Sequence, residues 1–250
     1  MNQVEPTASL PSSTTGTRPT RRLFLSGTDT DVGKTFVACA MAKHYRHSGM
    51  TVGVYKPVAS DCHPEPEPRG GERERCGGKL VAADALRLWD AAGKPRTLAE
   101  VCPQRFRAPL APTRAAAAEG KTVDADRLWQ AAQVWLRGFD ITIIEGAGGL
   151  LSPLAEGVLN LDLVKQLAPI DLVIVAANRL GVIHQTLATC AAAIHAGVTP
   201  AGIVLSDTTQ NQDASAEENA AEIARYTSVP ILGRVGYGAC EVPWADRLLG

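Results

Sequence analysis

A run of small and polar residues between two apolar segments is the part of the sequence best suited to chemistry. Residues 27–35 read Gly-Thr-Asp-Thr-Asp-Val-Gly-Lys-Thr, with an apolar stretch before them and a helix-like stretch after them. A strand, a small-residue turn and a helix that opens with Gly-Lys-Thr form a phosphate-binding loop, because backbone N–H groups and the positive helix end face the anion. Lys34 would add a mobile positive charge, and the Thr35 hydroxyl can bind Mg²⁺. The pattern predicts a nucleoside triphosphate site.

The spacing within this loop departs from the common pattern. Five residues separate Gly27 from Gly33, where the usual loop has four, and Thr28 stands where glycine is expected. The alternative is a chance Gly-Lys-Thr at a helix start, which the strand–loop–helix context disfavours.

Two further charged residues follow apolar strands. Lys56 ends a strand, and Pro57 removes the next backbone N–H, so the chain must leave the sheet there. This directs an ammonium group to the edge that carries the phosphate loop; the alternative is a solvated lysine. Glu145 follows a run of β-branched residues and precedes Gly146-Ala147-Gly148-Gly149. Since a buried carboxylate needs a partner, we expect it to bind Mg²⁺ or position water, the alternative being an acidic residue in a tight turn.

Other candidates are less specific. Asp84 lies near the start of a helix, where a helix-end charge and a metal ligand look alike. The segment 178–184, Asn-Arg-Leu-Gly-Val-Ile-His, is not the Asn-Lys-x-Asp that reads guanine, which weakens a GTPase interpretation. Free N–H groups near Val182 would suit a carboxylate. His184 and His195 are assigned no catalytic role.

The bulk properties narrow the class of protein. The chain has 25 basic and 26 acidic side chains, a balance that argues against nucleic acid or an anionic membrane as a partner. It contains no apolar run of the roughly 20 residues that a membrane span needs. Residues 1–20 predict a disordered tail without a secretory signal. Six cysteines without a Cys-x-x-Cys pair favour a reducing cytoplasm, and Cys62, His63 and Cys76 are too few for zinc.

The remaining sequence alternates between strand and helix patterns. Apolar, largely β-branched runs predict strands at 22–26, 51–55, 141–145, 172–176, 201–205 and 231–235. Ala-rich segments predict helices at 35–47, 80–91, 124–136, 161–166, 184–195 and 214–226. This order predicts a single α/β domain over 21–250, with a doubly wound, mostly parallel sheet and a P-loop. Residues 61–79, rich in Pro, Glu, Arg and Gly, predict a mobile loop.

Three segments taken together resemble one family. Gly27–Thr35, then Tyr55-Lys56-Pro57-Val58-Ala59-Ser60, then Glu145–Gly149 are similar to dethiobiotin synthase, and the likeness runs from about Arg22 to Trp244. The wider spacing in the phosphate loop is this family's own form. The resemblance implies a P-loop carboligase that makes dethiobiotin from 7,8-diaminononanoate and CO₂ with Mg-ATP. It also implies a homodimer in which the neighbouring subunit completes each substrate site.

The resemblance also implies a role for each matching residue. Lys56, Lys34 and Thr30 would be catalytic, with Lys56 holding a substrate carbamate and the γ-phosphate. Thr35, Asp84 and Glu145 would bind Mg²⁺. The nucleotide would be held by Asp31, Val32, Gly33, Lys34, Thr35, Phe36, Asp84, Glu145, Gly146, Ala147, Gly148, Ser206, Asp207, Val235, Gly236 and Tyr237. The substrate would contact Ser60 and, from the facing subunit, Leu180, Gly181, Val182 and Ile183.

The sequence departs from the family near the nucleotide base. Ser206-Asp207 stand where Asn-Asp is usual, and Gly236 stands in a turn that usually contains proline. His184-Gln185 replace Asn-His, and Asp61 replaces a small residue. The choice of base and the purpose of the 61–79 loop stay open.

Two other families share the phosphate loop. Amidotransferases that act on cobyrinic acid derivatives append a glutaminase domain, for which 250 residues leave no room. Partition ATPases carry an extra lysine early in the loop, where this chain has Thr28–Asp31, and often end in an amphipathic helix. Neither pattern fits.

Overall fold

A computed structural model describes residues 20–64, 80–211, 213–239 and 241–249. The expected N-terminal tail lies outside the described residues except for Thr20. Residues 65–79 of the expected loop also lie outside them. The ends of that loop, His63–Pro64 (β4) and Leu80–Val81 (β5), form a short antiparallel pair.

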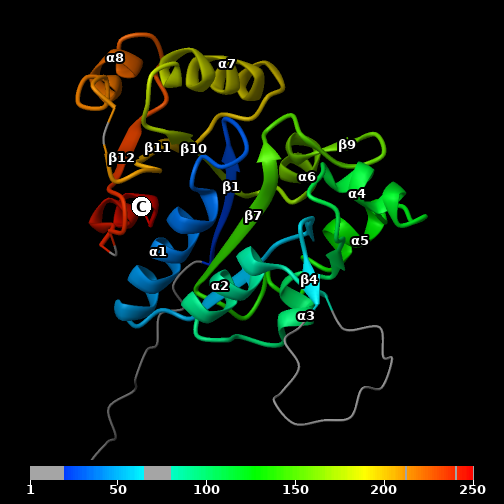
Figure 1. Ribbon diagram of the computed structural model, residues 1–250. Coiled ribbons are helices and arrows are strands. Elements are labelled where there is room, and N and C mark those ends of the chain that lie inside the picture. The colour runs from blue at the N-terminus through cyan, green and yellow to red at the C-terminus, as the bar shows by residue number, and fades with distance from the viewer. Residues whose placement is uncertain (1–19, 65–79, 212, 240, 250) are drawn as a thin grey trace, which may run out of the picture.

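A six-stranded parallel sheet forms the centre of the fold (Figure 1). Its strands are β1 (Arg21–Gly27), β2 (Val52–Tyr55), β7 (Ile141–Gly149), β10 (Asp171–Ala177), β11 (Gly202–Ser206) and β12 (Ile231–Val235). They lie in the order β12-β11-β10-β1-β7-β2, and every neighbouring pair is parallel. The prediction of a doubly wound parallel sheet is confirmed, with all six strands near their expected positions.

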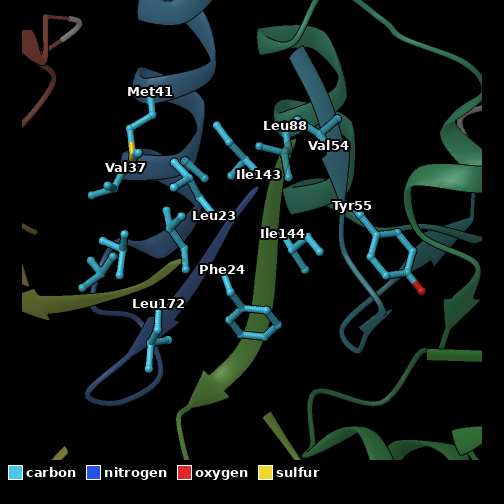
Figure 2. Packing of buried hydrophobic residues seen from close by; sticks show 14 of the residues in the cluster. Leu23, Phe24, Val37, Met41, Val54, Tyr55, Leu88, Ile143, Ile144 and Leu172 are labelled. Carbon is cyan, nitrogen blue, oxygen red and sulfur yellow. The ribbon is translucent and has the colours of Figure 1, made fainter. Parts of the chain in front are cut away.

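The strands are apolar almost without interruption because both faces of the sheet are covered. Leu23 and Phe24 are adjacent in β1 and therefore lie on opposite faces, yet both are fully buried (Figure 2). Val37 and Met41 project from α1 (Lys34–His47) into the same core.

Two groups of helices flank the sheet. The helix α1 packs against α2 (Ala83–Ala91) and the C-terminal 3-10 helix η1 (Pro243–Leu248). A second group pairs α5 (Ala125–Gln130) with α6 (Asn160–Gln166), and α7 (Val182–His195) with α8 (Asn219–Ala224). The connection through α1 runs toward the β2 edge of the sheet, whereas the connections through α6, α7 and α8 run toward the β12 edge. Because each crossover is right-handed, α1 lies on one face of the sheet and α6–α8 on the other. In the described part of the chain no helix is long and apolar enough to cross a bilayer.

Three helices are shorter than the sequence predicts. The helix expected from residue 80 begins at Ala83, since Leu80 and Val81 form β5. The helix expected over 124–136 ends at Gln130. Beyond it, the carbonyls of Trp135 and Leu136 accept hydrogen bonds from Thr142 and Arg22 of the sheet. The helix expected over 214–226 is regular only in α8.

Several short elements were not predicted, because two to seven residues carry too little periodicity. They are α3 (Leu98–Val101), α4 (Pro112–Ala118), β3 (Val58–Ala59), β6 (Gln104–Arg105), β8 (Pro153–Ala155) and β9 (Val158–Leu159). The strands β3 and β6 pair with each other, as do β8 and β9. Residues from or next to β3, α4 and β8 line the cavity described below.

The contact between α1 and the C-terminal segment leads to a stability prediction. The fully buried Tyr45 donates a hydrogen bond from its hydroxyl to the Ala245 carbonyl at 2.8 Å. Tyr45→Phe should lower the free energy of unfolding by about 1–3 kcal/mol, because a buried carbonyl loses its donor. Urea denaturation measures the change. The exposed Tyr226 provides the control, and Tyr226→Phe should change stability by less than about 0.5 kcal/mol. Equal effects of the two substitutions would contradict the assignment.

Candidate active site

The phosphate loop connects the end of β1 to the start of α1. Gly33 caps the helix with φ 89°, a left-handed conformation that favours glycine. A Cβ atom at this position would collide with the Ser206 hydroxyl at the end of β11. The loop therefore lies against the neighbouring strand with no room for a larger residue.

Lys34 is the first residue of α1 and is 7% exposed. Its Nζ donates a hydrogen bond to the Asp29 carbonyl at 3.0 Å. Burial lowers the pKa of the ammonium below its ordinary value, and the nearby Glu145 carboxylate only partly offsets this effect. An anion bound in the loop would favour the charged form.

A polar cluster beside the loop joins the buried Lys56 and Glu145 to the half-buried Thr35. Lys56 Nζ and Thr35 Oγ1 both donate to Glu145 Oε1, each at 2.7 Å. Asp84 Oδ2 lies 3.7 Å from Lys56 Nζ. Burial by itself would lower the pKa of Lys56, but the carboxylates of Glu145 and Asp84 outweigh burial and raise it. Lys56 therefore stays a cation in the interior.

The same cluster suits a hard divalent cation. Glu145 Oε2 is buried and has no hydrogen-bond partner among the described residues. Thr35 Oγ1 is hydrogen-bonded to the other oxygen of the Glu145 carboxylate. Asp84 lies beside Lys56, and its side chain is 45% exposed. Within the described ranges no group of three or more His, Cys, Asp or Glu side chains could hold a metal alone. A cation here would therefore need oxygen atoms from a ligand as well, which is how Mg²⁺ usually binds with phosphates.

A cavity of about 930 Å³ opens over the carboxyl ends of the strands. Its volume is within the usual range for a small-molecule site. The predicted site residues that line it are Thr30, Asp31, Gly33, Lys34, Thr35, Phe36, Lys56, Ser60, Asp84, Glu145, Gly146, Ala147, Gly148, Ser206, Asp207 and Tyr237. Val32, Val235 and Gly236 do not line it, and the side chains of Val32 and Val235 are buried in the core.

The cavity is also lined by Ser206, Asp207 and Tyr237. Asp207 is 6% exposed, and its carboxylate accepts hydrogen bonds from Arg234 Nε at 2.9 Å and Asn178 Nδ2 at 3.0 Å. This carboxylate is therefore held rigidly from behind, whereas Tyr237 is mostly exposed.

Comparison with known proteins identifies the family. A family profile described as an AAA domain matches residues 21–239. An ATP-dependent dethiobiotin synthetase BioD of Rhodopirellula baltica is 39% identical over 221 residues, covering 85% of this chain and 82% of the relative. A protein of the same name from Anaeromyxobacter dehalogenans is 40% identical, covering 83% and 86%. The chain belongs to the dethiobiotin synthetase family. The signal recognition particle receptor FtsY from Elizabethkingia anophelis shares the fold, with a TM-score of 0.52 at 14% identity over 96% of this chain and 68% of that one.

The turn expected to bind substrate in this family lies apart from the cavity. Leu180 to Ile183 follow β10 and open α7, and none of them lines the cavity. Leu180 is 81% exposed, whereas Val182 is buried. The expectation that this turn serves a second subunit stays a prediction.

Several cavity-lining residues were not predicted. Arg87 lies one turn beyond Asp84 on α2, and this spacing was the only sequence signal for it. Pro109 to Pro112 and Ser152 to Pro153 also line the cavity. Their sequences have no motif that marks them, because their position depends on how the chain returns across the sheet.

The close approach of Gly33 to Ser206 gives a prediction with an internal control. Gly33 and Gly197 both have positive φ, 89° and 82°, but an added Cβ meets another atom only at Gly33. Both Gly33→Ala and Gly197→Ala should lose about 1–2 kcal/mol of stability from backbone strain. Only Gly33→Ala should also weaken Mg-ATP binding, because the loop must shift. The expected loss of affinity is roughly tenfold or more, which corresponds to at least about 1.4 kcal/mol. Fluorescence titration with a labelled nucleotide measures this, and unchanged affinity would contradict the model of a tightly packed loop.

Proposed function

We propose that this protein closes the ureido ring of dethiobiotin from 7,8-diaminononanoate and CO₂, with ATP converted to ADP and phosphate. The polar cluster of Lys56, Glu145 and Thr35 beside the phosphate loop carries the proposal. It sets a fixed cation and a carboxylate with a free oxygen next to the place where a γ-phosphate would lie. The names of the relatives, ATP-dependent dethiobiotin synthetases, support the same reaction.

Mg²⁺ fits this cluster. Glu145 and Thr35 would hold it, with Asp84 at the exposed side, and it would neutralise charge on the phosphates. The unpaired Glu145 Oε2 is the observation that supports this assignment.

The chain's own residues would then manage the anions. One amine of the substrate adds to CO₂ and loses a proton, giving a carbamate. A carbamate oxygen attacks the γ-phosphorus, and the bond to the β-phosphate oxygen breaks, leaving a carbamic–phosphoric anhydride and ADP. The second amine attacks the carbonyl and expels phosphate, which closes the ring. Both reactants of the phosphoryl transfer are anions, so the positive charges of Lys34 and Lys56 would supply much of the stabilisation.

The substrate would be shared between two subunits. Ser60 lines the cavity and would contact the diamine end, while the Ile183 N–H at the start of α7 would receive its carboxylate, because the Val182 N–H already donates to the Arg179 carbonyl at 3.0 Å. The exposed Leu180 beside that helix start supports a surface role for the turn. A homodimer is therefore part of the proposal.

The reaction itself provides the first test. Purified protein with Mg-ATP and bicarbonate should release phosphate only when 7,8-diaminononanoate is added, and dethiobiotin should form in equal amount by mass spectrometry. Phosphate release that is independent of the diamine would rule out the ligase and would favour an ATPase switch.

The two lysines provide the second test. Lys34→Ala and Lys56→Ala should each lower turnover by roughly 100-fold or more, because each removes a charge that acts at the transition state. The exposed Lys165, which does not line the cavity, supplies the control Lys165→Ala with unchanged turnover. Circular dichroism verifies that each variant is folded. Normal turnover of folded Lys56→Ala would show that its ammonium has another purpose.

A further inference from the structure

We propose that Asn160 is a positioning residue that sets the conformation of the loop after Glu145, and with it the binding of the metal–nucleotide complex. The inference rests on the proposed function for its catalytic consequence, but its effect on nucleotide binding is independent of the ligase reaction. None of the sequence motifs includes this residue.

Asn160 is the first residue of α6 and is fully buried. Its Nδ2 donates to the carbonyls of Ala147 at 2.7 Å and Gly149 at 2.8 Å, and approaches the Ser152 carbonyl at 3.3 Å. One side chain therefore ties together three carbonyls of the segment that follows Glu145. An amide nitrogen suits this task because it donates two hydrogen bonds and carries no charge.

The contact with Ala147 fixes the orientation of the next N–H group. The only cis peptide among the described residues is Ala168–Pro169, so the bond between Ala147 and Gly148 is trans. In a trans peptide the C=O and N–H groups point in opposite directions. Since Asn160 holds the Ala147 carbonyl on the protein side, the Gly148 N–H points the other way. Gly148 lines the cavity, where this donor would be available to an anion.

Backbone contacts connect the same segment to the phosphate loop. Gly149 pairs with Gly27 across β7 and β1, and the Leu150 N–H donates to the Gly27 carbonyl at 3.1 Å. The Leu161 N–H of α6 donates in turn to the Leu150 carbonyl at 3.1 Å. A shift of α6 would therefore move both the segment that follows Glu145 and Gly27, the first residue of the phosphate loop.

The side-chain oxygen of Asn160 points to a role beyond stability. Asn160 Oδ1 is buried and has no partner among the described residues, and a Cβ at Gly146 would collide with it. An unsatisfied buried oxygen lowers stability. Its retention is understandable if the nitrogen of the same amide is needed to orient the loop, while Gly146 leaves space for the oxygen.

The experiment compares Asn160→Leu with Leu163→Ala. Leu163 lies on the same helix and is 1% exposed, but it makes no hydrogen bond to the loop, so Leu163→Ala controls for general loss of packing. We expect Asn160→Leu to weaken Mg-ADP binding by roughly 10- to 100-fold, as loss of an outer partner of a metal site does. Isothermal titration calorimetry with Mg-ADP measures this without turnover. Leu163→Ala should lower the melting temperature and leave the affinity unchanged.

A milder variant keeps the test decisive if Asn160→Leu does not fold. The Ser152 hydroxyl accepts a hydrogen bond from the Gly149 N–H at 2.9 Å, on the same loop. Ser152→Ala should weaken Mg-ADP binding in the same direction and by less. If folded Asn160→Leu binds Mg-ADP like the unsubstituted protein, or if Ser152→Ala leaves binding unchanged where Asn160→Leu does not fold, the proposal is wrong. Absence of diamine-dependent phosphate release by the unsubstituted protein would instead remove the proposed function.

Discussion

The ion pair between Lys56 and Glu145 is the interaction on which the rest of the site depends. Both side chains are almost fully buried, and each places an opposite charge within hydrogen-bond distance of the other, which offsets part of the cost of burial. Buried ion pairs contribute little net stability, because desolvation offsets most of the attraction. Two buried charges at the floor of a cavity are therefore better explained by chemistry than by folding. The Glu145 carboxylate keeps Lys56 protonated, so that its ammonium group is ready to contact a bound anion.

A parallel sheet can bring the members of this ion pair together with the phosphate loop. The carboxyl ends of neighbouring parallel strands meet at one edge, and β1, β7 and β2 are neighbours in the sheet. They deliver the phosphate loop, Glu145 and Lys56 to that edge from segments far apart in the sequence. The strands are mostly apolar and are packed on both faces, so the polar residues at this edge do not need to stabilise the sheet. Asn160 then holds the segment 146–149 at this edge, whose glycines would otherwise leave its conformation loosely determined.

Much of this arrangement could be predicted from the sequence, and the reasons are local. Continuous β-branched runs predict buried parallel strands, and Gly-Lys-Thr before a helix predicts the phosphate loop wherever it occurs. Lys56 could be placed because Pro57 ends its strand. The residues that were missed depend on contacts between distant segments. Arg87, Ser152 and Asn160 lie in unremarkable helix or loop sequences, and only the folded chain shows what they face.

The charges that line the cavity explain why a metal–nucleotide complex suits it better than a free nucleotide. Among the described residues, Lys34, Lys56 and Arg87 face Asp31, Asp61, Asp84, Glu145 and Asp207. Three of these carboxylates already lie in ion pairs, Glu145 and Asp84 with Lys56 and Asp207 with Arg234. The charges left over are those of Lys34 and Arg87 on one side and Asp31 and Asp61 on the other. They give no excess of positive charge to bind a polyanionic nucleotide. A divalent cation would supply the missing positive charge, because the carboxylates near Lys56 would then coordinate the cation instead of repelling the phosphates. In the proposed reaction the acidic residues of the site would thus make the metal a condition for binding the triphosphate, and the lysines would act on the charge that develops during transfer.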